Sequence, residues 1–188
     1  MKRSLLLAVL FFIGFVSFAQ KAETFTINPT KSIVKWSGKK IVGGNTEGTI
    51  SISNGNLQFN AQKLAKGDIV MDTKSITSEK ASPRLVEHLK NEDFFDVEKY
   101  PTATFKIESV KGNIVKGIMT IKGIAHSLSF PADITYSKDV VVAKANGIKV
   151  NRTLYNVKYK SGSIFSGLGD GAIEDNFVLD IILVSEKK

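Results

Sequence analysis

Apolar residues recur at every second position along most of this chain, and a period of two is typical of β-strands with one buried face. The pattern is clearest near the C-terminus, where Phe177, Leu179 and Ile181 share one predicted face. Within the run 63–76, Met71 lies on one face and Asp72 on the other. We expect about eight strands from the ten alternating runs, which cover residues 24–27, 32–40, 48–53, 56–60, 63–76, 102–110, 114–122, 128–136, 140–150 and 177–184.

Glycine and asparagine mark the breaks between these runs. Asn54-Gly55 predicts a tight hairpin turn, because this pair readily adopts the positive φ angles that such a turn requires. Gly43-Gly44-Asn45 predicts a bend or a bulge, and residues 123–127 are expected to form a loop.

One segment, residues 78–91, predicts a helix instead of a strand. Ser82 is a suitable N-cap and Pro83 a suitable first helical residue, since proline lacks the amide hydrogen that has no partner there. Leu85 and Leu89 recur at helical spacing. We therefore expect a single short helix that covers one end or flank of the sheet.

The first residues predict export. Lys2 and Arg3 are followed by an apolar run over residues 5–16 and by Ser17-Phe18-Ala19, which is the organisation of a secretory signal peptide. The apolar run is shorter than the roughly 20 residues of a membrane-spanning helix. We expect residues 1–19 to be the signal peptide, with cleavage after Ala19, and residues 20–188 to form one periplasmic or secreted domain.

The composition of residues 20–188 narrows the function classes. They contain 24 basic and 18 acidic side chains, and the whole sequence has no cysteine. The fold must therefore depend on packing and sheet pairing without disulfides. The lysines are spread along the predicted strands, so no nucleic-acid partner is expected. Attraction to anionic membrane surfaces is a secondary expectation, and a second copy of the chain is another partner that the sequence leaves open.

Candidate catalytic and metal-binding groups are sparse. His88 and His126 lie on separate predicted elements without spaced carboxylates, whereas a zinc site needs three or four converging ligands. We expect His88 at the surface or rim and His126 in a solvated turn. Ser161 and Ser163 have no histidine or acid at a recognisable offset, so an enzymatic function, metal or cofactor is not expected.

The bulky apolar residues predict the interior. Many antiparallel strands in one domain indicate a sandwich or a closed barrel, and eight strands close around just enough space for one apolar ligand. A register error of one residue would exchange the inward set for its neighbours. The predicted cavity lining is Trp36, Ile69, Met71, Phe94, Phe95, Phe105, Ile107, Met119, Ile121, Phe130, Leu179 and Ile181.

The junction at residues 91–105 is the most distinctive stretch of the sequence. Acidic residues surround Phe94-Phe95, and Tyr100-Pro101 then begins an alternating strand. This junction resembles the signature of the YceI-like family, and in particular its Bacteroidetes-type branch. Further matching segments are residues 34–40, 72–76, 117–123, 151–159 and 169–175.

The resemblance implies an all-β, antiparallel, eight-stranded lipocalin-like barrel with one short helical insertion. It also implies that the barrel binds a polyisoprenoid, an isoprenoid quinone or a fatty-acyl lipid for sequestration or transport. Asn156 stands where the family usually has glycine, and asparagine can adopt the same left-handed backbone. A non-enzymatic envelope stress or interaction protein with a filled barrel core is the alternative.

Overall fold

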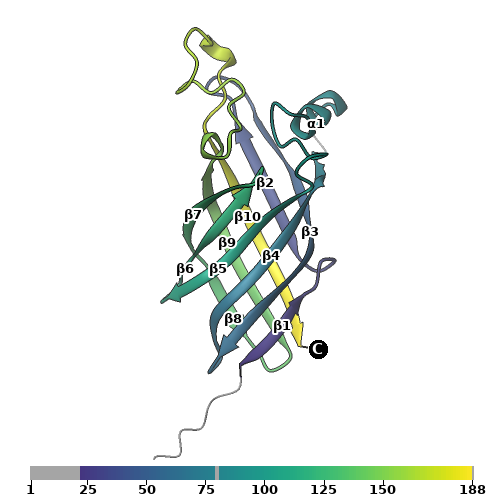
Figure 1. Cartoon of the computed structure of the whole chain (residues 1–188), viewed down its shortest axis with the longest axis vertical. Helices are drawn as coiled ribbons and strands as arrows, with labels where there is room; N and C mark the ends of the chain where they lie inside the picture. Colours follow the sequence, from purple (N-terminus) through teal and green to yellow (C-terminus); the bar gives the residue numbers. More distant parts are fainter. Residues whose placement is uncertain (1–21, 79–80, 188) are drawn as a thin grey trace, which may run out of the picture.

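The structure, a computed structural model, describes residues 22–78 and 81–187, so the predicted signal peptide lies outside the described residues. The described chain forms one antiparallel sheet of ten strands and one α-helix (Figure 1). The elements are β1 Glu23–Ile27, β2 Ile33–Lys39, β3 Asn45–Asn60, β4 Lys63–Thr77, α1 Pro83–Lys90, β5 Thr102–Lys111, β6 Ile114–Ile121, β7 Ile124–Pro131, β8 Asp133–Tyr136, β9 Val140–Asn151 and β10 Asn176–Lys187.

The ten strands occupy eight positions around a barrel. β1 and β2 follow one another in the same position, because both pair with β3 on one side and β10 on the other. β7 and β8 likewise share a position: β7 pairs with β6, and after a break at Ala132 β8 pairs with β9. The chain itself completes the barrel, because it passes directly from β7, paired with β6, to β8, paired with β9. The predicted eight-stranded antiparallel barrel with one short helix is confirmed.

A seam remains beside β7. Among the described residues, β7 has backbone pairing with β6 alone. His126, on β7, spans the seam instead: its Nε2 lies 3.0 Å from the carbonyl oxygen of Leu154, in the 3-10 turn Arg152–Tyr155 that follows β9. The expectation of a solvated turn histidine was wrong, since His126 is half-buried in a strand.

Two predicted turns were also wrong. β3 runs straight through Asn54-Gly55 with a register shift there, and the hairpin turn lies at Ala61-Gln62, where φ is 51° and 61°. Gly55 is needed in the strand because a Cβ would lie 2.6 Å from the carbonyl oxygen of Asp68. Residues 123–127 are not a loop either, since Lys122-Gly123 is a tight turn and β7 begins at Ile124.

The helix is shorter than predicted but begins where the sequence indicated. The backbone amide of Leu85 donates to Oγ of Ser82, which caps the helix, and Pro83 is its first residue. Residues 79–80 lie outside the described residues. Within the described part of the chain, no helix has the length and apolar character needed to span a bilayer.

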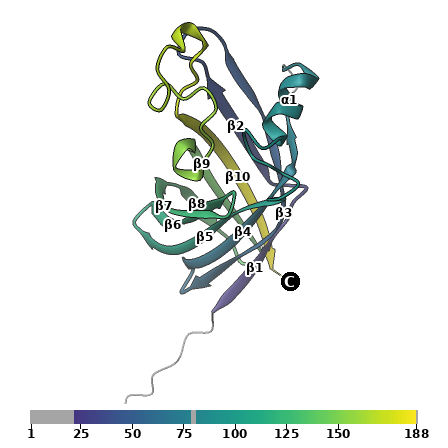
Figure 2. The same cartoon turned by 45° about the horizontal axis from the view of Figure 1, so that its top comes forward.

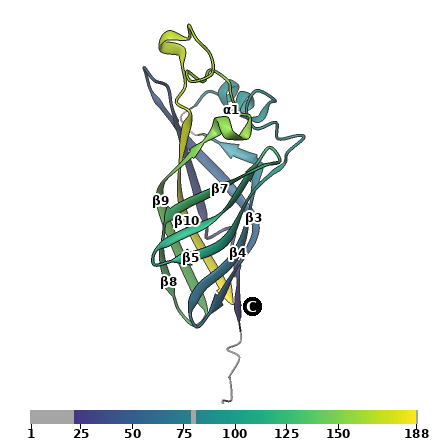
Figure 3. The same ribbon diagram turned by 60° about the vertical axis from the view of Figure 1, so that its left-hand side comes forward.

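The two ends of the barrel differ. One end is filled by Phe25, Phe59 and Tyr136, whose ring centroids lie 5.3 to 5.6 Å apart. The phenol of Tyr136 donates a hydrogen bond to Glu23 across this end. The other end carries α1, the turn between β2 and β3 and the long loop before β10 (Figures 2 and 3). We call this end the mouth.

Close approach of two strands at Gly48 generates a stability prediction. A Cβ at Gly48 would lie 1.7 Å from the Thr77 carbonyl oxygen and 2.9 Å from Cε2 of Trp36. We expect Gly48→Ala to lower the free energy of unfolding by about 1–3 kcal/mol, the usual range for overpacking. Urea denaturation measures this, with Gly44→Ala as the control because a Cβ there meets nothing within 4 Å. Equal midpoints for the two variants would contradict the prediction.

Candidate functional site

Two apolar cavities lie one after the other inside the barrel. The upper cavity, near the mouth, has a volume of about 170 Å³, and the lower one about 50 Å³. Met71, Met119 and Leu179 line both cavities and therefore form a waist between them. The lower cavity extends toward Leu57 and Leu64, which come from the part of the barrel nearer its filled end.

The inward set expected from the alternation lies at these cavities. The junction residues Phe94 and Phe95 line the upper cavity beneath the mouth, as the sequence indicated. The strand residues divide between the cavities according to their height in the barrel. Trp36 and Ile121 line the upper cavity only; Ile69, Phe105, Ile107, Phe130 and Ile181 line the lower one only; and Met71, Met119 and Leu179 line both.

The waist is made of flexible side chains. Met71 on β4 is paired with Ala103 on β5, and Met119 on β6 is paired with Phe105, so the two thioethers project inward from opposite neighbours of β5. Both are at most 5% exposed. Methionine has three rotatable bonds and adapts to irregular space more readily than leucine or isoleucine. The separation of the two cavities therefore depends on side chains that can change rotamer.

The buried polar groups around the upper cavity are already bonded to the protein. Nε1 of Trp36 donates to the Thr77 carbonyl oxygen at 3.2 Å, and the Thr73 hydroxyl donates to the Tyr100 carbonyl oxygen at 2.7 Å. Two buried side-chain polar atoms of the described residues lack a partner, Asn56 Oδ1 and Ser185 Oγ, and neither residue lines a cavity. The interior thus offers shape and apolar contact, while Lys39, Lys40, Glu174 and Asn176 stand at its exposed outer end.

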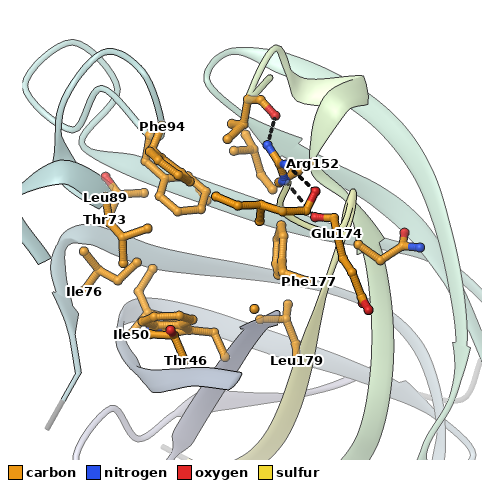
Figure 4. A pocket seen from close by; sticks show the side chains of 18 of the residues that line it. Thr46, Ile50, Thr73, Ile76, Leu89, Phe94, Arg152, Glu174, Phe177 and Leu179 are labelled. Atoms are coloured by element: carbon orange, nitrogen blue, oxygen red, sulfur yellow. Dashed lines mark hydrogen bonds between the residues drawn. The ribbon is translucent and has the colours of Figure 1, made fainter. Parts of the chain in front are cut away.

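Aromatic rings form a roof across the mouth. Figure 4 shows Leu89 and Phe94 facing Phe177 and Leu179 across the pocket. The Phe94 ring lies 5.3 Å from Tyr159 of the opposite loop, and His88 packs edge-on against both rings at 5.0 and 4.5 Å. His88 is thus a rim residue, as predicted. The roof joins the segment after α1 to the loop before β10, so movement of either segment would open the cavity.

A buried arginine holds the opposite wall of the mouth. Arg152 is 4% exposed, and its guanidinium donates hydrogen bonds of 2.9 to 3.1 Å to the carbonyl oxygens of Val157, Tyr159, Ile173 and Glu174 (Figure 4). Burial lowers the pKa of Arg152, while arginine has so high an ordinary value that the cation persists. Four of its five N–H groups donate to the loop backbone, so the main role of Arg152 is to shape the mouth.

Asp175 completes this cluster. Its Oδ1 lies 3.9 Å from Arg152 Nη2, and its two carboxylate oxygens accept hydrogen bonds from the hydroxyls of Ser161 and Ser163. Burial raises the pKa of Asp175, but the serine hydrogen bonds and the Arg152 charge together outweigh it and lower the pKa overall. No acid stands at a recognisable sequence offset from these serines; Asp175 is distant from them in sequence and close in space. Arg152 and Asp175 therefore hold separate parts of the loop together, and we call this pair the Arg152 clamp.

The predicted lining omits part of the upper wall. Arg152, Thr73, Leu89 and Phe177 also line the upper cavity. The alternation already placed Phe177 on the predicted face of Leu179 and Ile181, and the helical spacing of Leu89 was a usable signal. Nothing local indicated Arg152, because its four acceptors lie on a loop with no periodic pattern. The left-handed backbone expected at Asn156 is present, with φ 60° and ψ 26°.

Comparison with protein families gives one match over most of the chain. Residues 25–184 match a YceI-like domain. A UPF0312 protein of Yersinia enterocolitica is 26% identical over 141 residues, which is 71% of each chain. A UPF0312 protein of Staphylococcus aureus is 36% identical over a shorter stretch of 74 residues, which covers 38% of this chain and 43% of the relative.

Solved structures with the same fold include two from other bacteria. Burkholderia cenocepacia BcnA superposes with a TM-score of 0.67 at 23% identity, covering 84% of this chain and 98% of that one. A polyisoprenoid binding domain from Saccharophagus degradans, implicated in plant cell wall breakdown, gives 0.66 at 11% identity, with coverage of 87% and 98%. At these identities the likeness is one of fold.

The lowered pKa of Asp175 predicts acid sensitivity of the Arg152 clamp. A carboxyl group whose pKa is lower in the folded state stabilises the fold above its ordinary value, and this contribution is lost as the pH falls below about 4. We expect Asp175→Asn to lower stability near neutral pH and to shrink the difference between about pH 7 and about pH 3. Thermal unfolding and hydrogen exchange in residues 156–175 measure both effects. An unchanged pH dependence in the variant would refute the role of Asp175.

Proposed function

This chain belongs to the YceI-like domain family, and from that premise we propose that it carries a long apolar chain inside its barrel. The observation that carries the proposal is the cavity pair, whose buried polar neighbours are all bonded to backbone carbonyls. Such an interior favours ligands that are apolar and elongated. The ligand class is a polyisoprenoid, an isoprenoid quinone or a fatty-acyl lipid, and the polyisoprenoid binding domain of similar fold supports it. The role is sequestration or transport in the cell envelope, after removal of residues 1–19.

Burial of the tail supplies enough free energy for useful affinity. Each buried CH₂ contributes about 0.8 kcal/mol, and a micromolar complex needs about 8 kcal/mol. Roughly ten to fifteen buried carbons therefore suffice once part of the gain is offset by lost freedom of motion. Binding of this kind requires no polar readout inside the barrel, in keeping with the bonded state of Trp36 and Thr73.

The size of the empty space favours an adaptable interior. Pockets for small molecules commonly measure about 300–1,000 Å³, whereas the two cavities measure about 170 and 50 Å³. We infer that a tail enters between the roof rings, fills the upper cavity and displaces the Met71 and Met119 side chains to reach the lower one. The small volumes also favour the second candidate, an envelope interaction protein with a filled core. Native mass spectrometry of protein purified without added lipid separates the two.

Blocking the upper cavity tests the location of the tail. Ala103 is 6% exposed and lines the upper cavity, so Ala103→Trp fills the space without adding charge. We expect loss of the co-purified lipid and at least about a tenfold weaker affinity for added isoprenols, since about 1.4 kcal/mol corresponds to tenfold. Ala125→Trp on the exposed face of β7 is the matched control. A folded Ala103→Trp protein that carries the same lipid as wild type would show that the tail lies elsewhere.

Widening the waist tests the passage between the cavities. Met119→Ala joins the two spaces at a cost of about 2–5 kcal/mol in stability. We expect affinity to rise with isoprenol length beyond the point at which it levels off in wild type. Trp36 is the sole tryptophan and lines the upper cavity, so its fluorescence reports the titrations. Ile52→Val, buried in the core but outside both cavities, controls for loss of stability alone. Identical length dependence in wild type and Met119→Ala would exclude passage through the waist.

A further inference from the structure

Exposed apolar side chains gather at the mouth. Ile41 and Val42 are 56% and 54% exposed at the turn between β2 and β3, and Ile164 and Phe165 are 43% and 48% exposed on the loop before β10. Both turns lie at the end of the barrel opposite the C-terminus (Figures 1 and 3). None of these four side chains belongs to the buried core, so the packing of the core does not explain why apolar residues stand here.

The two turns form one rigid unit. The backbone amide of Ile41 donates to the Ala172 carbonyl oxygen at 2.9 Å, and the amide of Glu174 donates to the Lys39 carbonyl oxygen at 2.9 Å. Lys40 and Ile173 form an antiparallel bridge between these bonds. Ser161 forms a second bridge with Ile173, and its carbonyl oxygen accepts from the amides of Ile164 and Phe165. Both apolar pairs are therefore connected to Ile173, and the Arg152 clamp holds the loop that carries one of them.

Lysines flank both apolar pairs. Lys39 and Lys40 immediately precede Ile41 in the sequence, and Lys158 and Lys160 precede Ile164 on the loop. All four lysines are exposed. Residues 39–42 and 152–175 together carry five basic and three acidic side chains. Apolar side chains at a tip with basic residues around them are the pattern of a protein that sits in the interface of an anionic membrane.

We propose that this mouth tip, residues 39–42 and 158–165, docks on an anionic lipid bilayer. Ile41, Val42, Ile164 and Phe165 insert at the boundary between head groups and acyl chains, and the lysines contact lipid phosphates. The proposal rests on the proposed function, because docking at this end directs the cavity opening toward the membrane. An apolar chain then passes between the bilayer and the barrel without crossing water.

A lipid surface fits this tip better than a protein partner does. A stable protein interface involves about 20–30 residues on each side, whereas the tip presents four apolar side chains on two turns. Insertion into a bilayer needs no complementary partner surface, and a few apolar side chains with basic neighbours give reversible binding. Reversible binding is what a carrier that leaves the membrane with its ligand requires.

Vesicle flotation of the chain that begins at Gln20 tests the docking. The probes are vesicles of phosphatidylcholine alone and of phosphatidylcholine with roughly one third phosphatidylglycerol, both without added ligand. We expect wild type to float with the anionic vesicles and to bind phosphatidylcholine at least about tenfold less well. Ile164→Ser/Phe165→Ser is expected to lower binding to the anionic vesicles by about tenfold or more.

Two matched controls separate the tip from the rest of the surface. Ile33 and Ile182 are a cross-strand pair on the outer wall, 44% and 37% exposed. Ile33→Ser/Ile182→Ser removes this apolar pair and should bind vesicles as wild type does. Lys158→Gln/Lys160→Gln is expected to lower binding about fivefold per lysine at low salt. Lys106→Gln/Lys149→Gln removes the same charge from exposed positions on β5 and β9 and should have little effect.

The outcomes distinguish docking from tail binding. Fluorescence titration of Trp36 with a soluble isoprenol measures tail binding in the same variants, and the apolar tip residues line neither cavity. Normal tail binding without flotation of wild type overturns the docking and leaves the carrier function intact. Equal flotation of Ile164→Ser/Phe165→Ser and Ile33→Ser/Ile182→Ser also overturns the docking. So does a result in which the tip binds an envelope protein and does not bind the vesicles. Selective loss of flotation in the tip variants supports it.

Discussion

Closure of the sheet is the constraint on which the rest of this molecule depends. A strand edge left open would expose unpaired amide and carbonyl groups, and an open sheet would enclose no interior. The short β8 supplies the closing ladder: Asp133 pairs with Lys144 and Tyr136 with Val141. Ala132 interrupts the extended segment, so β7 before it pairs with β6 and β8 after it pairs with β9. The apolar faces of the strands, which would otherwise contact solvent, therefore line one system of cavities.

The interior and the mouth are built by different physics. Inside, alternation places mainly apolar residues at the inward positions, and the flexible side chains of Met71 and Met119 divide the space but leave it adaptable. At the mouth, the long loop makes only a short backbone bridge to the end of β2, at Lys40 and Ile173. Arg152 holds this loop with a rigid fork of donors, and Asp175 balances its charge. The loop can therefore be irregular and still hold its shape.

These two parts suit a carrier of apolar chains. An interior without free polar groups binds by area and shape, and so tolerates related tails. In the proposed function, selectivity and exchange belong to the mouth, where the rings of His88, Phe94 and Tyr159 lie across the entry. The proposed docking of the mouth tip, with its exposed apolar and basic side chains, directs that opening toward the surface from which such chains come.

The sequence by itself determined the class of fold, the inward residues and the helix start, because each depends on local periodicity or on capping chemistry. Trp36, Phe105 and Met119 follow from alternation, and Ser82-Pro83 sets the beginning of α1. Asn54-Gly55 misled because the same glycine that permits a turn also permits close packing of strands, and only the neighbouring Asp68 backbone decides between them. The tertiary structure alone decided three features: the division of the cavity at Met71 and Met119, the change of pairing partner from β6 to β9 at Ala132, and the contact between Arg152 and Asp175. Each of these depends on groups that are far apart in sequence and meet only when the barrel closes.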